Sequence, residues 1–257
     1  MSLFLSELPL ALAAVLLVLL PTLISMGGPI LVRRHVELHR LTTNNEIAGF
    51  KFATVGVIYA VILAFAVISV WEKYSEAEVV VTEEAGAAAT LYRLTTHTVS
   101  EAGAAKAALS RYLRTAIEFD WPQMAIERES REARLALTDL YRAVMALPQN
   151  GSTNAAAFAE MLHQLDTLTQ ARRTRLRLAS GIVPAMVWVV LTLGAALTIV
   201  FTFFFGTKNL WAQVAMTGIL SLLVFMGLLV VLSFDHPFTG PVHVGPEAIQ
   251  TVLEEFG

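Results

Sequence analysis

The sequence predicts an all-α, polytopic membrane protein with four transmembrane helices and a helical soluble domain inserted between helices two and three. Of the 257 residues, 56% are hydrophobic and only 15% are charged, whereas soluble domains are usually about 45–50% apolar. Four uncharged runs are long enough to cross a hydrocarbon core, which takes roughly 20 helical residues. Between the second and third runs lie 13 of the 18 Lys and Arg residues. This segment is therefore expected to lie in water.

The four runs cover residues 8–32, 52–71, 182–205 and 210–234. The first run could be a cleaved signal peptide, but no positive charge precedes it and it is longer than a signal h-region, so we predict a true span. We divide the chain into residues 1–71 with the first two spans, 72–181 as the soluble domain, 182–234 with the last two spans, and a tail at 235–257. We expect a multi-pass protein of the cell (inner) membrane. Basic residues near the membrane ends are equally frequent on both sides, so the side of the soluble domain stays open.

The soluble domain is predicted to continue the second span as a long helix. Apolar residues recur every three or four positions from Leu91 to Phe119, the period of a helix with one buried face. The sequence Asp120, Trp121, Pro122 predicts a stop and a restart, because proline is favoured in the first turn of a helix. Two further helices follow, and the last of them returns to the membrane. In the tail, Ile249, Val252, Leu253 and Phe256 are predicted to pack on these helices.

Composition excludes several functions. A net charge of −3 gives no basic field for nucleic acid, so we expect no nucleic-acid partner. The absence of cysteine excludes disulfides, thiolate nucleophiles and thiolate metal sites. The sequence has no GxSxG, P-loop, HExxH or EF-hand motif. We therefore predict that the protein is not an enzyme and uses no cofactor.

Three stretches resemble a family of bacterial membrane proteins described as bestrophin-like. They are NNEIAGFKFATVGVIYAVILAFAVISVWEKYSEAE, the LYRL that follows it, and LSFDHPFTGPVHVGPEAI near the end. Bestrophins are pentameric anion channels whose pore is lined by one transmembrane helix from each subunit. The resemblance therefore implies an oligomeric channel with a central pore. The acidic calcium-clasp pattern of animal bestrophins is not recognisable here, which puts calcium gating and strict anion selectivity in doubt.

The second span carries two different stripes at the helical spacing of about 100° per residue. One is made of small residues, which allow close helix packing in lipid: Gly49, Ala53, Gly56, Ala60 and Ala64. Roughly opposite lies a stripe that is polar at both ends and apolar in the middle, which we predict to line a pore: Lys51, Thr54, Ile58, Ile62, Phe65, Ser69 and Glu72. Beyond the membrane, Glu72, Glu76 and Glu83 are predicted to form an acidic mouth.

These patterns predict a homo-oligomer in the lipid bilayer that conducts an inorganic ion. The apolar middle of the stripe could gate by dewetting, and the acidic mouth favours cations, including calcium. The resemblance favours chloride, and the two alternatives stay open. Two other interpretations also stay open. The stripe could face lipid, with Lys51 and Glu72 snorkelling to the interfaces, or the protein could be a non-conducting scaffold or sensor.

Other candidate residues have simpler explanations. Glu46 is expected to cap the second span, with ion contact as the alternative. Asp235 is expected to end the fourth span in a turn, with an ion or subunit contact as the alternative. His35 and His39 share the i, i+4 spacing of a helical metal site but make an incomplete ligand set, so the metal is unknown. The basic run from Arg172 to Arg177 is interpreted as a juxtamembrane anchor.

Overall fold

A computed structural model describes residues 9–43, 45–98, 102–148, 152–240 and 242–256, and no strand occurs among them. The chain forms two compact units. The membrane unit comprises Met1–Glu72 and Gly181–Asp235, and the second unit comprises Lys73–Ser180 and His236–Gly257. The all-helical fold class is as predicted.

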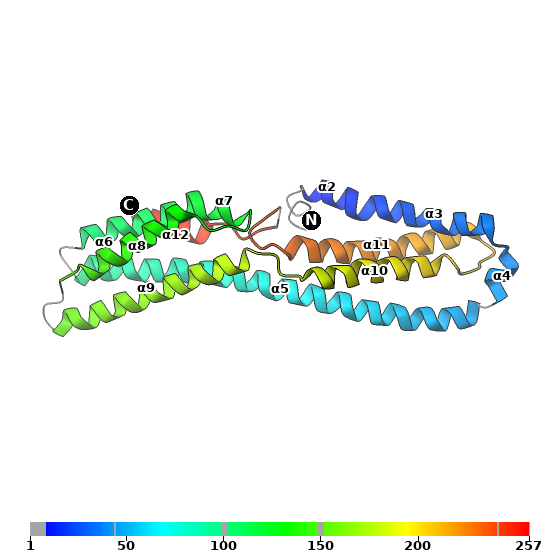
Figure 1. Ribbon diagram of the computed structural model, residues 1–257, viewed down its shortest axis with the longest axis horizontal. Coiled ribbons are helices and arrows are strands. Elements are labelled where there is room, and N and C mark those ends of the chain that lie inside the picture. Colours follow the sequence, from blue (N-terminus) through cyan, green and yellow to red (C-terminus); the bar gives the residue numbers. More distant parts are fainter. Residues whose placement is uncertain (1–8, 44, 99–101, 149–151, 241, 257) are drawn as a thin grey trace. The chain divides into compact units, whose positions relative to one another are not determined.

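The membrane unit contains four helices that are long and apolar enough to span a bilayer (Figure 1). The first consists of α2 (Leu10–Ala14), a π turn η1 (Val15–Leu19) and α3 (Leu20–His35). The second is the membrane part of α5 (Asn45–Thr98), and α10 (Ala185–Thr202) and α11 (Leu210–Phe234) are the third and fourth. These are the four predicted spans, although position 8 lies outside the described residues. The third span begins later than predicted, because Pro184 is the N-cap of α10.

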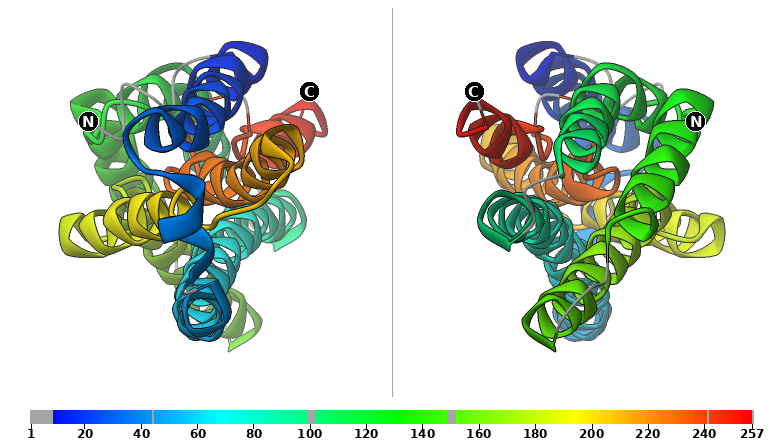
Figure 2. Two further views of the ribbon diagram at one scale, coloured as in Figure 1. Left: turned by 90° about the vertical axis from the view of Figure 1, so that its right-hand side faces the viewer. Right: turned by 90° about the vertical axis from the view of Figure 1, so that its left-hand side faces the viewer.

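Glycines bring the spans of the membrane unit close together, and the four run alongside one another (Figures 1 and 2). A Cβ atom on Gly194 of α10 would lie 2.6 Å from the ring of Tyr59 on α5, and one on Gly227 of α11 would lie 2.7 Å from Leu63. A Cβ on Gly218 of α11 would lie 3.0 Å from the sulfur of Met26 on α3. Small residues thus let helix backbones approach, which is how helices associate in lipid.

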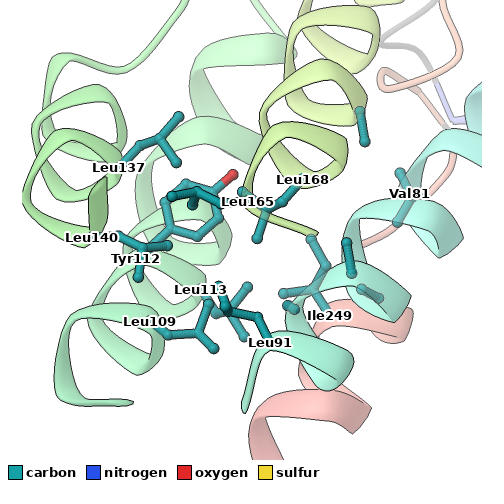
Figure 3. Packing of buried hydrophobic residues seen from close by; sticks show 14 of the residues in the cluster. Val81, Leu91, Leu109, Tyr112, Leu113, Leu137, Leu140, Leu165, Leu168 and Ile249 are labelled. Carbon is teal, nitrogen blue, oxygen red and sulfur yellow. The ribbon is translucent and has the colours of Figure 1, made fainter. Parts of the chain in front are cut away.

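The second unit is a bundle of helices around one apolar core. It contains the rest of α5, then α6 (Gly103–Thr115), the π turn η2 (Ala116–Asp120), α7 (Trp121–Met124), α8 (Arg131–Met145), α9 (Ser152–Leu178) and α12 (Glu247–Glu254). Figure 3 shows apolar side chains from five of these helices meeting in the core, among them Leu91, Leu113, Leu140, Leu165 and Ile249. Amphipathic helices bury their apolar faces in this way.

The helix breaks in the second unit differ from the prediction. The expected stop at Asp120 is wrong, because helical backbone passes through η2 directly into α7, but Pro122 lies in the first turn of α7 as expected. A π turn shifts the register of the backbone hydrogen bonds by one residue. The π turn η2 lies immediately before α7, which contains Pro122, and proline has no N–H to donate. A helix start that was not predicted lies earlier, at Gly103, where α6 begins after Ala102, whose backbone is not α-helical. The next helix, α8, begins where the Ser130 hydroxyl accepts a hydrogen bond from the Ala133 amide at 3.1 Å.

The predicted packing of the tail is confirmed. Ile249 of α12 is fully buried, and Val252, Leu253 and Phe256 pack against the same core. The ring of Phe256 stacks on Tyr92 of α5 with centroids 3.8 Å apart, and the Tyr92 hydroxyl donates to the Phe256 carbonyl at 2.9 Å. The tail is therefore part of the bundle of the second unit.

Candidate ion-conduction surface

Within the membrane unit, α5 packs through one narrow face. Tyr59, Ala66 and Val70 are buried on this face, each one or two turns from the next. Tyr59 lies in a cluster with Ala195 and Ile199 of α10 and Val224 of α11. Most other positions of the span are open, which leaves a large apolar surface on a single protomer.

The predicted pore-lining stripe lies mainly on this open surface. Lys51, Thr54, Ser69 and Glu72 are exposed, and Ile58 and Phe65 have 57% and 69% of their surface exposed. Ile62 differs, because it is half-buried against the cluster around Val70. At about 100° per residue, the stripe lies on the flank of the buried face, roughly a quarter turn away. The stripe is therefore exposed in the protomer, except at Ile62, which borders the buried face.

The structure reveals a second exposed ridge that the sequence reasoning missed. Phe50, Val57, Val61 and Ile68 are 79%, 64%, 48% and 52% exposed. At about 100° per residue they lie directly opposite the buried face. The sequence alone shows no signal for this ridge, because its residues are as apolar as those that pack inside the unit.

The small-residue stripe does not pack within the protomer. Ala53, Ala60 and Ala64 are exposed, and Gly49 and Gly56 are half-buried. A Cβ atom on Gly56 would have nothing within 4 Å. The close glycine contacts with Tyr59 and Leu63 of α5 come instead from Gly194 on α10 and Gly227 on α11. Helix packing through the predicted stripe therefore stays a prediction, and its partner would be a different molecule.

The acidic residues predicted for the mouth differ in their surroundings. Glu72 and Glu83 are exposed. Glu76 is paired with the ammonium group of Lys73 at 2.6 Å and lies 3.7 Å from the guanidinium of Arg177. Its charge is therefore partly neutralised, and Glu72 and Glu83 are the stronger candidates for attracting cations.

Glu46 and Asp235 occupy structural positions. Glu46 is exposed in the first turn of α5, where a carboxylate is favoured by the helix dipole. Asp235 is 1% exposed. Its carboxylate accepts hydrogen bonds from the backbone amides of Ile182 and Val183 at 3.0 and 2.7 Å and from the Trp188 indole at 3.2 Å. These bonds join the end of α11 to the segment leading into α10 and support the structural interpretation of Asp235.

The two histidines do not share a helix. His35 ends α3, the backbone of Val36 is extended, and His39 belongs to α4 (Leu38–Thr43). Among the described residues, no group of three or more His, Asp or Glu side chains could hold a metal ion.

The interpretation of the basic run as a juxtamembrane anchor is wrong for two of its members. Arg172 and Arg175 are 4% and 0% exposed, because they form ion pairs inside the second unit. Arg175 pairs with Glu84 and Asp120, and Arg172 pairs with Asp120 and Glu129. Arg173 and Arg177 are exposed. Hydropathy could not reveal this ion-pair cluster, because its acidic and basic side chains lie far apart in the sequence and meet only when the helices pack.

Comparisons with known proteins agree with this architecture. Residues 19–249 match the family model of the Bestrophin-like domain. The structure is similar to that of a bacterial bestrophin homologue from Klebsiella pneumoniae carrying a single point mutation, at 18% identity and a TM-score of 0.73, covering 94% of this chain and 98% of that one. It is also similar to the bestrophin homologue from the same organism solved by Zn-SAD phasing, at 15% identity and a TM-score of 0.72, covering 93% and 96%.

A search of the curated proteins gave no match. The matched family domain covers most of the chain, from the first span to α12. With its four apolar spans, the chain is a multi-pass membrane protein of a kind consistent with the inner membrane. This chain therefore belongs to the Bestrophin-like family.

Proposed function

We propose that this chain is the subunit of a homo-oligomeric ion channel whose central conduit is lined by the open surface of α5. The observation that carries the proposal is the narrow packing face of α5, which leaves Phe65, Val57 and Phe50 more than half exposed in one protomer. Membership in the Bestrophin-like family supports a channel and a non-enzymatic role.

The burial pattern suggests how α5 could be oriented in such an oligomer. If α10 and α11 of each subunit lie outside, the ridge opposite the buried face, including Val57 and Val61, points toward the axis. The stripe with Ile58 and Phe65 then forms one edge of the wall. The small residues form the other edge, where Ala60 and Gly56 would allow a neighbouring helix to come close. An apolar conduit of this kind can gate by dewetting.

The proposed ion class rests on the charge at one end of the conduit. Glu72 is exposed and, repeated around a symmetry axis, would concentrate cations over about one Debye length of ~8 Å. We propose cation permeation, including calcium, with chloride as the alternative outcome of the test.

Reversal potentials of the reconstituted protein under a salt gradient test this proposal. We expect a cation-directed shift that decreases in Glu72→Gln. Glu78→Gln is the matched control, since Glu78 is exposed on the same helix but lies off the stripe. An anion-directed shift that survives Glu72→Gln would rule out cation selectivity. Absence of flux from dye-loaded liposomes would favour a non-conducting protein.

Cysteine labelling tests which side of α5 faces water. The chain has no cysteine, so each introduced thiol reports alone. We expect a water-soluble thiol reagent to label Val57→Cys and Val61→Cys, with Ile58→Cys and Phe65→Cys reacting at the edge. Ala66→Cys, which is buried in the unit, is the control. If only lipid-soluble probes labelled the four exposed positions, the proposal of a conduit lined by α5 would be wrong.

A further inference from the structure

A groove between α8 and α9 in the second unit combines cationic and apolar side chains. Its lining includes Arg134, Leu137 and Tyr141 from α8 and Arg172, Arg173 and Leu176 from α9. These residues follow the spacings i, i+3, i+7 on α8 and i, i+1, i+4 on α9, so each helix contributes one face. The cavity has a volume of about 460 Å³, within the usual range for small-molecule sites.

The charges in this groove are unequal. Three guanidinium groups line it, those of Arg134, Arg172 and Arg173, against the one carboxylate of Glu129. Glu129 lies between two of them, with its Oε1 3.1 Å from Nη1 of Arg172 and its Oε2 3.5 Å from Nη1 of Arg134. Arg173 is exposed and forms no salt bridge within the described part of the chain. Because Arg172 is also paired with Asp120, the excess cationic charge of the groove lies at Arg134 and Arg173.

Arg172 gives the groove a fixed cationic wall. It is 4% exposed, and its Nε and Nη2 donate to the two carboxylate oxygens of Asp120 at 2.9 and 3.1 Å. Such a two-point contact fixes the plane of the guanidinium group. Farther along the groove, the Tyr141 and Thr169 hydroxyl groups are 3.0 Å apart. A site that is held in place before binding loses less entropy when a ligand arrives.

We propose that this groove binds a small organic anion, a phosphate or carboxylate with an apolar body. Its anionic group would lie between Arg134 and Arg173, in competition with the carboxylate of Glu129. Its apolar body would lie against Leu137, Tyr141 and Leu176. Guanidinium groups suit both carboxylate and phosphate, because their planar fork matches two oxygens at once. The proposal is independent of ion conduction, since it concerns binding to the second unit.

Titration of the full-length protein in detergent with phenyl phosphate tests the proposal, with inorganic phosphate as the probe that lacks an apolar body. We expect saturable binding of phenyl phosphate that is tighter than that of inorganic phosphate. Arg134→Gln and Arg173→Gln should each weaken it by about tenfold, the usual scale for one charged hydrogen bond. Glu129→Gln should strengthen it, because it removes the competing carboxylate.

The matched control is Arg142→Gln, a change of the same charge on α8 at an arginine that pairs with Asp139 outside the groove. It should leave binding unchanged. Arg134, Arg142 and Arg173 are all exposed, so each variant is expected to fold, which circular dichroism checks. Equal affinities in Arg134→Gln, Arg173→Gln and Arg142→Gln would overturn the site, as would the absence of saturable binding to both wild type and Glu129→Gln.

Discussion

Arg175 on α9 binds Glu84 on α5 through two contacts, from Nε to Oε2 at 2.6 Å and from Nη2 to Oε1 at 3.0 Å, and neither side chain is exposed. The Arg175 guanidinium also lies over the Trp121 ring, 4.3 Å from its centroid. Burial, the largest single influence, acts to lower the pKa of Arg175, but the charges of Glu84 and Asp120 and the hydrogen bonds to Glu84 act together to raise the pKa above its usual value. Arg175 therefore stays charged in the core of the second unit.

Removing one partner of this pair should destabilise the second unit. Glu84→Ala leaves the Arg175 guanidinium buried with less compensation, which typically costs about 3–5 kcal/mol. Thermal unfolding in detergent, followed by circular dichroism, measures the loss. Arg177→Gln is the control, because Arg177 is exposed and lies 3.7 Å from its partner Glu76, and exposed pairs contribute about 0–1 kcal/mol. Equal melting temperatures for the two variants would contradict this prediction.

Tyr112 should make the second unit sensitive to alkali. Its hydroxyl donates to Glu84, and burial, together with the Glu84 charge, raises its pKa well above the ordinary value of 10.0. The folded state thus keeps the phenol proton above the pH at which the unfolded chain releases it. This stabilisation is complete below a pH of about 10 and is lost as the pH rises above it.

Tyr112→Phe tests this pH dependence. The variant should be less stable at pH 7 by about 1–3 kcal/mol, because one oxygen of Glu84 loses a donor in the core. Its melting temperature should fall less than that of the wild type between pH 9 and pH 11. Parallel falls in the two proteins would show that Tyr112 does not control the alkaline transition.

Gly194 should tolerate no side chain. A Cβ at this position would lie 2.6 Å from the ring of Tyr59, so Gly194→Ala must displace this ring, a strain that usually costs about 1–3 kcal/mol. Gly27→Ala is the matched control, because a Cβ on Gly27 of α3 would meet nothing within 4 Å and alanine favours helix by about 1 kcal/mol. We expect a lower melting temperature for Gly194→Ala alone. A similar loss in Gly27→Ala would contradict the prediction.

Asp235 should hold the start of the third span in place. Asp235→Ala removes the acceptor of three hydrogen bonds, from Ile182, Val183 and Trp188, and bonds to charged groups contribute about 1.5–3 kcal/mol each. Asp235→Asn keeps the shape and one acceptor oxygen, so it should lose less. Thermal unfolding in detergent, followed by circular dichroism, measures the loss. Equal stability of the alanine and asparagine variants would argue against the hydrogen-bonding role.

The stripes on α5 show what could be predicted about the candidate site. The period of Lys51, Thr54, Ile58 and Phe65 placed these residues on one face, and the structure leaves them open. The opposite ridge with Val57 and Val61 could not be predicted, since lipid-facing, pore-facing and packed positions of a span are all apolar. Only the contacts of Tyr59 and Val70 with α10 and α11 identify the packed face and so the directions of the others.

The sequence by itself determined the four spans, because a bilayer demands uninterrupted apolar helices of a set length, and that signal is local along the chain. It also determined that the tail carries an apolar face, since the period of Ile249, Val252 and Phe256 is local too. The tertiary structure alone decided that Arg172 and Arg175 are buried. Their partners Glu84 and Asp120 lie some 50 to 90 residues away along the chain, and the free energy of a buried charge depends on such distant neighbours rather than on the residues beside it.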